Sequence, residues 1–278
     1  MPTLNTVDIS AYTKSIDMAK VAQQCDTIII KATEGAGDGE NNPFFSGPGR
    51  NDWQAARDAG LVRGAYHLFY SRPGSSTPDQ QAAHFLNRLA HIRDGDLPPA
   101  IDLEPDLSFK GMADRTAAIA AVLRWLQLVE SGLKARTGKA LKPFIYANPS
   151  VINDELHNPP AFADYPLFLA HYAPTPAAPR PWSNDDILIW QYRENTSIPA
   201  TVDDCDFCQF STFQRGSRGR PVRAIQNRLI ASGLLPAGSA DGAFDSATHE
   251  AVKKFQDGHG LAVDGVVSPR TWVAMQWA

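Results

Sequence analysis

The chain has 278 residues, of which 43% are hydrophobic and 20% charged, and its formal net charge is −4. This composition is that of a globular protein with one large and one small domain, and without a Lys/Arg run nucleic acid is not an expected partner. No apolar run approaches the roughly 20 residues that cross a membrane, and Met1 to Asp8 lack signal-peptide features, so we expect synthesis in the cytoplasm and no membrane insertion.

Strand-forming and helix-forming segments alternate along the first half of the chain. Runs rich in β-branched and apolar residues predict strands at 6–10, 27–35, 62–69, 97–105 and 143–146. Helical composition, with apolar residues three or four apart in the longer segments, predicts helices near 16–21, 51–60, 79–92 and 119–133. This rhythm indicates strand–helix units that build a parallel sheet.

The rhythm changes after residue 146. Strands are predicted at 167–172, 187–192 and 202–210, but the connections between them are poor helix formers, and the first is rich in proline. Eight strands, the first five mostly parallel, predict an α/β fold: a TIM-like (β/α)5(β)3 barrel, here followed by a small three-helix domain.

Two carboxylates stand two positions apart in the apolar segment from Leu97 to Pro105. Side chains two apart on a strand share one face, so Asp102 and Glu104 project together, roughly 6–7 Å apart at the backbone. Each raises the pKa of the other and burial adds to this, so one of them can hold a proton at neutral pH. Glycosidases use such a pair, one protonated carboxylic acid and one carboxylate, to cleave a glycosidic bond.

Further acidic and aromatic residues are expected at the same end of the barrel, where catalysis occurs in such folds. The acids at or near strand carboxyl ends are Asp8, Glu34, Asp102, Glu104 and the group from Asp203 to Asp206. The aromatic residues expected there to bind a sugar are Tyr66, Tyr146, Tyr172, Trp190 and Tyr192. The alternative is that barrel mouths are simply polar and that aromatic residues fill cores. It is the better account of any single tyrosine or of His67, and the weaker account of the acids taken together.

The three cysteines, Cys25, Cys205 and Cys208, are too few for a disulfide framework. Cys205 and Cys208 form a lone CxxC, without the second pair of a structural zinc site or the strand and helix of a redox site. We therefore favour buried free thiols and expect no metal and no cofactor.

Short segments spread over about residues 5–212 resemble glycoside hydrolase family 25, the N-acetylmuramidase lysozymes. The matching segments are Val7 to Ser10, Lys31 to Gly35, Gly64 to His67, Ile101 to Glu104, Phe144 to Tyr146, Leu169 to Tyr172 and Trp190 to Tyr192. The resemblance implies a barrel of eight strands and five helices that cleaves the β-1,4 bond between N-acetylmuramic acid and N-acetylglucosamine.

The resemblance also implies roles for individual acids. Glu104 matches the general acid/base and Asp102 the carboxylate that stabilises the transition state, while Asp8 and a later aspartate complete the site. Asp206 is preferred for that last position, with Asp203 as the alternative. The family implies retention, by attack of either a carboxylate or the substrate's own N-acetyl group. We expect Glu104 to hold a proton in dry surroundings and Asp102 to stay charged.

The last part of the chain contains an internal repeat. Asp241-Gly242 precedes Thr248 by the same interval as Asp264-Gly265 precedes Thr271. Each Asp-Gly predicts a turn and each threonine the start of a helix. With the apolar stripes around 222–229 and 251–255, this segment resembles the PG_binding_1 type of peptidoglycan-binding domain. The expected division is a catalytic barrel over 1–213, a short flexible linker over 214–220 and a binding domain over 221–278.

Three functions are weighed. The first is an endolysin-like lysozyme that is tethered by its tail to bacterial peptidoglycan, acts as a monomer, and reaches the wall after release through a membrane pore or by specialised secretion. The second is a non-catalytic wall-binding protein on an inactivated barrel, against which the intact Asp102 and Glu104 pair argues. The third is a chitinase-like glycosidase, whose longer acidic strand motif is absent from the sequence.

Overall fold

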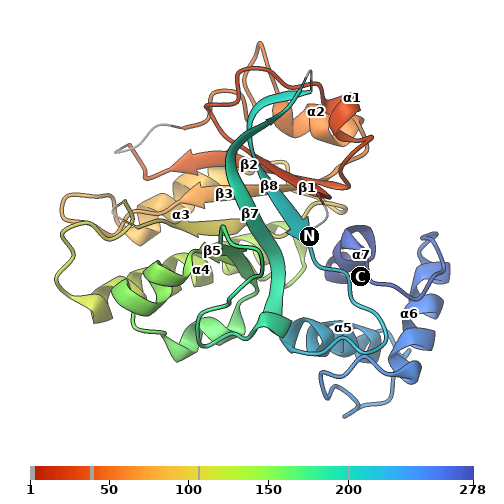
Figure 1. The fold of residues 1–278 in the computed structure, drawn as a ribbon. Helices are drawn as coiled ribbons and strands as arrows, with labels where there is room; N and C mark the ends of the chain where they lie inside the picture. Colours follow the sequence, from red (N-terminus) through yellow and green to blue (C-terminus); the bar gives the residue numbers. More distant parts are fainter. Residues whose placement is uncertain (1–3, 38–40, 106, 200) are drawn as a thin grey trace.

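The computed structural model describes residues 4–37, 41–105, 107–199 and 201–278, which form a closed barrel with a helical unit at one end (Figure 1). The strands are β1 (Thr6–Ile9), β2 (Thr27–Glu34), β3 (Val62–Leu68), β4 (Ala100–Leu103), β5 (Phe144–Ala147), β6 (Leu167–Ala170), β7 (Ile187–Ile198) and β8 (Val202–Phe210). Neighbours from β1 to β7 pair in parallel, and β8 closes the barrel antiparallel to both β7 and β1. The predicted eight-stranded barrel is confirmed.

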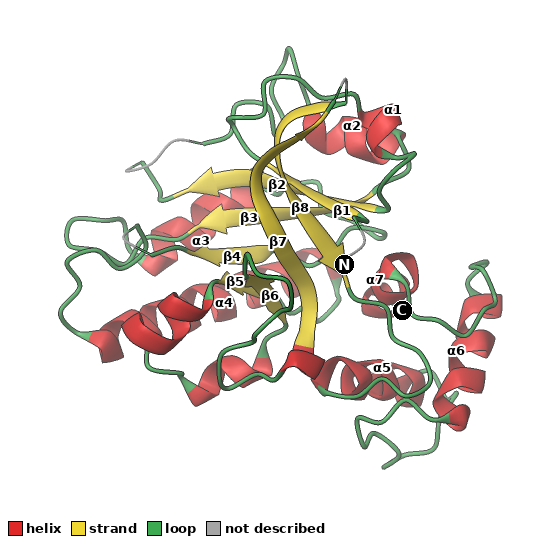
Figure 2. Ribbon diagram, in the orientation of Figure 1, coloured by secondary structure: helices red, strands yellow, loops and turns green. Residues whose placement is uncertain are grey.

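Helices cover the first part of the barrel and become short after β5 (Figure 2). The barrel helices are α1 (Met18–Val21), α2 (Asp52–Asp58), α3 (Pro78–Arg88) and α4 (Arg115–Thr137), followed by a π-helix, η1 (Val151–Glu155), and two 3-10 helices, η2 (Pro160–Asp164) and η3 (Asn184–Asp186). Local signals set their starts: Thr77 and Gln80 form a reciprocal capping box on α3. No helix among the described residues is long and apolar enough to cross a membrane.

The C-terminal unit consists of α5 (Arg220–Ala231), α6 (Ser246–Gly258) and α7 (Pro269–Trp277). Its sequence repeat is a repeat of hydrogen bonds. Gln226 on α5 accepts from the Gly242 amide (2.8 Å) and donates to Asp241 and Thr248. Gln256 on α6 does the same with Gly265 (2.9 Å), Asp264 and Thr271. Each buried glutamine thus ties an Asp-Gly turn to the first turn of the next helix.

The segment expected to be a flexible linker is bonded on both sides. The amides of Gly216 and Gly219 donate to the carbonyls of Phe244 and Gly242 in the C-terminal unit. Gly219 has φ +107°, and a Cβ there would lie 2.4 Å from the Asp185 carbonyl of the barrel, so only glycine fits this contact. The Asp186 carboxylate accepts from the Arg220 amide at the start of α5 (2.7 Å). The junction is therefore a packed contact, which corrects the expectation of flexibility.

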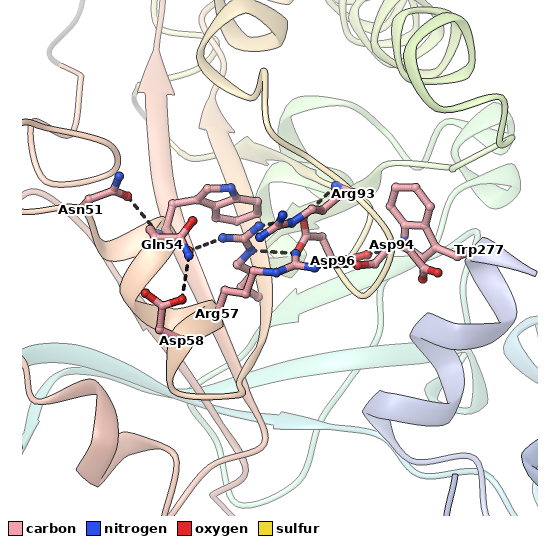
Figure 3. Close-up of polar contacts among 10 residues, drawn as sticks. Asn51, Gln54, Arg57, Asp58, Arg93, Asp94, Asp96 and Trp277 are labelled. Atoms are coloured by element: carbon pink, nitrogen blue, oxygen red, sulfur yellow. Dashed lines mark hydrogen bonds and ion pairs between the residues drawn. The ribbon is translucent and has the colours of Figure 1, made fainter. Parts of the chain in front are cut away.

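The C-terminal unit packs against the amino ends of the barrel strands, which we call the barrel floor. Arg270 donates to the Gly60 carbonyl before β3 (2.7 Å), and Arg228 donates to the Ala140 carbonyl before β5 (3.2 Å). The Trp277 indole, 8% exposed, donates to the Asp96 carbonyl before β4 (2.7 Å; Figure 3). Figure 1 accordingly shows the C-terminal unit at the end opposite the arrowheads of β2 and β3.

A buried ion pair lies under this contact. The Asp96 carboxylate accepts from Arg63 Nε (2.7 Å) and Nη2 (3.1 Å), from the Arg93 amide (2.9 Å) and from Arg57 at 3.4 Å (Figure 3). The Arg63 guanidinium also lies over the Trp53 ring, 3.9 Å from its centroid. Every charged atom of this floor pair has a partner, which is what makes its burial tolerable.

Candidate active site

A cavity of about 690 Å³ opens at the carboxyl ends of the strands, which we call the barrel mouth. Its acidic lining residues are Asp8, Glu34, Asp102, Glu104, Glu194, Asp204 and Asp206, and its tyrosines are Tyr12, Tyr66, Tyr70, Tyr146 and Tyr172. Among the described residues that line it, Lys31 is the only cationic side chain. The cavity is thus strongly acidic and open enough for an extended polar ligand.

Asp102 and Glu104 lie together in this cavity, as their spacing predicted. Asp102 is on β4 and Glu104 follows the end of the strand, so both face the barrel interior. The Glu104 backbone is held by a turn in which its amide donates to Ser108 Oγ (2.9 Å) and its carbonyl accepts from the Ser108 amide (3.0 Å). Asp102 is 3% exposed, while Glu104 is only partly buried and faces the opening.

Burial dominates the electrostatics of the pair. It raises the pKa of Asp102 well above its usual value, and the neighbouring Glu104 charge raises it further. Burial also raises the pKa of Glu104, against the attraction of Lys31. The expectation that Glu104 lies in a pKa-raising environment agrees with the structure. Asp102 is the more deeply buried of the two acids, and the expectation that it stays charged remains a prediction.

Asp8 and Asp206 form a second acidic pair across the seam between β1 and β8. Their Cα atoms are register partners, and Gln191 Nε2 donates to both carboxylates, at 3.3 and 3.1 Å. Burial raises the pKa of Asp8 well above its usual value and that of Asp206 to about 6. Asp203, the alternative to Asp206, is exposed and does not line the cavity, because strand alternation sends it to the other face of β8.

A bulge in β2 brings Lys31 and Glu34 to the same side. Residues three apart on a regular strand face opposite ways, but the register with β3 shifts between Lys31 and Thr33. Lys31 and Glu34 therefore both line the mouth and form an ion pair, while Thr33 hydrogen-bonds His67 on the outer side (2.8 Å). Glu34 also accepts from the Tyr70 hydroxyl (2.9 Å). Lys31, the only cationic side chain among the described lining residues, is thus paired with Glu34 and faces several more acids.

Of the aromatic residues predicted to bind sugar, Tyr66, Tyr146 and Tyr172 line the cavity. Tyr172 is 48% exposed, and Tyr12, which the sequence did not single out, is 72% exposed at the rim. Trp190 and Tyr192 do not line it, which corrects that expectation. Gln191 between them points inward, so its two neighbours point to the outer face of β7, where Trp190 donates to the His171 carbonyl (2.8 Å).

The three cysteines are free and buried, as expected, and burial raises the pKa of Cys25 and Cys205 to about 12. Such thiols are protonated and unreactive at neutral pH. In the parts of the chain that the structure describes, no cluster of three or more His, Cys, Asp or Glu side chains is arranged to hold a metal ion.

A closed β/α barrel with paired carboxylates and exposed tyrosines at its mouth defines a glycosidase-like site. The family model of glycosyl hydrolases family 25 matches residues 7–201, and the chain belongs to this family. A second model, that of a peptidoglycan binding domain, matches residues 218–275. The chain is therefore a glycosidase that hydrolyses peptidoglycan.

The chain is also similar to individual relatives and to solved structures over most of its length. The chain is 33% identical to the protein YegX of Escherichia coli O6:H1, over 75% of this chain and 70% of that one. It is 29% identical to lysozyme M1 of Streptomyces globisporus, covering 80% and 71% of the two chains. Among solved structures, a muramidase from Trichobolus zukalii is 28% identical with a TM-score of 0.57, covering 76% of this chain and 93% of the other.

Proposed function

We propose that the barrel cleaves the β-1,4 bond between N-acetylmuramic acid and N-acetylglucosamine, with Glu104 as general acid/base and Asp102 as the stabilising carboxylate. The observation that carries this proposal is the placement of both side chains on one face of the β4 end, above an open cavity. The second acidic pair, Asp8 and Asp206, faces the same space and completes the site.

The difference in depth between the two acids supports their division of labour. Glu104 is at the opening, where it can reach the glycosidic oxygen, and a bound glycan would bury it further and raise its pKa. Because two close carboxylates disfavour double ionisation, the pair carries one proton, which the glycan then draws to Glu104. Asp102 is left as the anion, with Lys31 as the nearby positive charge.

Proton transfer from Glu104 to the leaving oxygen would then coincide with positive charge on the sugar, which the Asp102 carboxylate stabilises. Glu104, now deprotonated, takes a proton from the water that completes hydrolysis. We propose retention at the anomeric carbon, by attack of either a carboxylate or the N-acetyl group of the substrate. Tyr66, Tyr146 and Tyr172, with Glu34, are proposed to contact the glycan.

The C-terminal unit is proposed to hold the enzyme on the wall. It raises the local concentration of the barrel at an insoluble substrate without changing its chemistry. We propose boundaries near 213 and 221, with the intervening segment packed as described. That the enzyme is a monomer, and that it reaches the wall by release through a membrane pore or by specialised secretion, remain proposals made from the sequence.

The decisive variant for the proposed function is Glu104→Gln, which keeps the shape of the side chain and removes the acid. Release of reducing ends from purified peptidoglycan should fall by about 10²–10⁴-fold, the usual contribution of a general acid. Co-sedimentation with the wall should be unchanged. Asp58→Asn, an exposed carboxylate on α2, is the matched control and should lyse like the wild type. Native lysis by Glu104→Gln would remove Glu104 from its role.

A further inference from the structure

One buried side chain connects four of the residues at the mouth. Gln191 on β7 is 1% exposed. Its Oε1 accepts from the hydroxyls of Tyr146 (2.8 Å) and Tyr172 (2.6 Å), and its Nε2 donates to Asp8 Oδ2 (3.3 Å) and Asp206 Oδ2 (3.1 Å). An amide has two N–H donors and two acceptor lone pairs, so its full hydrogen-bonding capacity is used.

The partners fix which way the amide faces. Turned over, Gln191 would place its carbonyl oxygen against two carboxylates, which cannot donate when ionised. The observed orientation instead gives each carboxylate one N–H, and hydrogen bonds to the charged form favour that form. The four partners come from four places around the barrel, namely β1, β5, β8 and the end of β6, so one side chain sets their relative positions.

We propose that Gln191 is a positioning residue of the active site, which holds Asp8 and Asp206 as carboxylates facing the glycan and turns the Tyr146 and Tyr172 hydroxyls inward. This inference rests on the proposed function and deepens it. Gln191 Oε1 accepts both hydroxyls, and Tyr172 has Tyr146 and Glu194 as further hydrogen-bond partners. The lone pairs that remain on the two hydroxyls would accept hydrogen bonds from substrate donors, such as the N–H of an acetamido group or a sugar hydroxyl.

Most other charged groups around this network disfavour ionisation of Asp8 and Asp206 and so raise their pKa values. Negative charge near Asp8 and Asp206 comes from Glu104, Glu194 and Asp204, and Glu194 also lies against Tyr172. Lys31 and the backbone amides of Ile9 and Asn195 favour the ionised forms. The Cys205 and Cys208 thiols stay neutral, since burial raises their pKa. Removing the Gln191 amide should therefore make the two carboxylates harder to ionise.

The test is the acidic limb of the pH profile of kcat/KM on soluble glycan chains. Gln191→Glu puts a further acid between Asp8 and Asp206, and Gln191→Met removes both N–H donors at similar length. In each we expect the limb to move to higher pH by about one unit, with at least about tenfold lower activity on the acid side of the wild-type optimum. A limb that superimposes on the wild type, whatever the loss in activity, would overturn the proposal.

A matched variant separates the two ends of the amide. The double change Tyr146→Phe and Tyr172→Phe removes the hydroxyls and leaves the N–H groups on the carboxylates. It should raise KM without moving the acidic limb, and a moved limb would contradict the proposal even if both Gln191 variants fail to fold. These shifts are independent of Glu104→Gln. If that variant stays active while the Gln191 limb moves, the acid assignment fails and the positioning role stands.

Discussion

The two ends of the barrel use aspartate in opposite ways. At the floor, Asp96 has Arg63, Arg57 and a backbone amide as partners for its carboxylate. At the mouth, Asp8 and Asp102 are also buried, yet each keeps one carboxylate oxygen with no hydrogen-bond partner. Burial without a partner is costly. The barrel bears this cost at the end that opens to solvent and avoids it at the end that the C-terminal unit covers.

The contrast separates the aspartate that stabilises the fold from the aspartates that serve the reaction. A paired carboxylate contributes a fixed charge that positions its neighbours, whereas an unpaired one has a raised pKa and can exchange a proton. The same substitution at the two ends should therefore have opposite consequences.

The largest effect is expected on activity at the mouth. Asp102→Asn keeps the volume of the side chain and removes the negative charge that stabilises the sugar cation. Hydrolysis of peptidoglycan should fall by about 10²–10³-fold, which is the usual loss when one preorganised electrostatic group is removed. The free energy of unfolding at pH 7, measured with urea, should not fall. If the variant were destabilised and still active, Asp102 would have a structural role like that of Asp96.

The reverse result is expected at the floor. Asp96→Asn leaves the Arg63 guanidinium, itself 1% exposed, without a counter-charge. The free energy of unfolding should fall by about 3–5 kcal/mol, the usual cost of breaking a buried ion pair. Activity per folded molecule on soluble glycan chains should match the wild type. Unchanged urea stability would show that the floor pair carries no stability.

The pH dependence of stability sharpens the comparison. Burial raises the folded-state pKa of Asp206 to about 6, so the folded state binds more protons than the unfolded state. Stability from this group is fullest below the ordinary Asp pKa near 4 and is lost as the pH rises through about 6. Urea unfolding of the wild type between these values should lose on the order of 1–2 kcal/mol through Asp206, after allowance for solvent screening.

Asp206→Asn should make that decline shallower, whatever its effect on stability at any one pH. Because the comparison is of slopes, hydrogen bonds that the amide loses do not disturb it. A decline as steep in Asp206→Asn as in the wild type would place the titrating group elsewhere.

The smallest effect concerns the contact between the two units. Trp277→Phe keeps the ring against the floor and removes the indole N–H that donates to the Asp96 carbonyl. Stability should fall by about 1 kcal/mol, the net value of one hydrogen bond, with no change in hydrolysis of soluble chains. A thermal melt against the wild type measures this. No change in the melt would mean that water replaces the indole without loss.

The sequence predicted the mouth better than the floor for a physical reason. Carboxyl ends of parallel strands converge, so acids that follow apolar runs, such as Asp8, Asp102 and Glu104, could be assigned to one place without coordinates. The contact of Trp277 with Asp96 joins residues far apart in the chain, and no local pattern marks it. The same holds for Gly219, which looked like part of a flexible linker.

The sequence also did not reveal which side chains of a buried strand face the barrel interior. The run from Ile187 to Tyr192 is buried on both sides through most of its length, so its sequence does not alternate and does not reveal which residues face inward. The sequence predicts Trp190 and Tyr192 as sugar contacts, but both side chains face outward. The signal that could have found Gln191 and Lys31 is that each is the first polar residue after a buried apolar run, 187–190 in β7 and 28–30 in β2, where burial demands partners.

The most direct test of the account is the identity of the new reducing end. Purified peptidoglycan is digested with the full chain, the products are reduced with borohydride, and mass spectrometry determines which sugar has become the alcohol. We predict that the reduced sugar is N-acetylmuramic acid and that its amount falls sharply with Glu104→Gln. Reduced N-acetylglucosamine, or cleavage confined to the peptides, would contradict it.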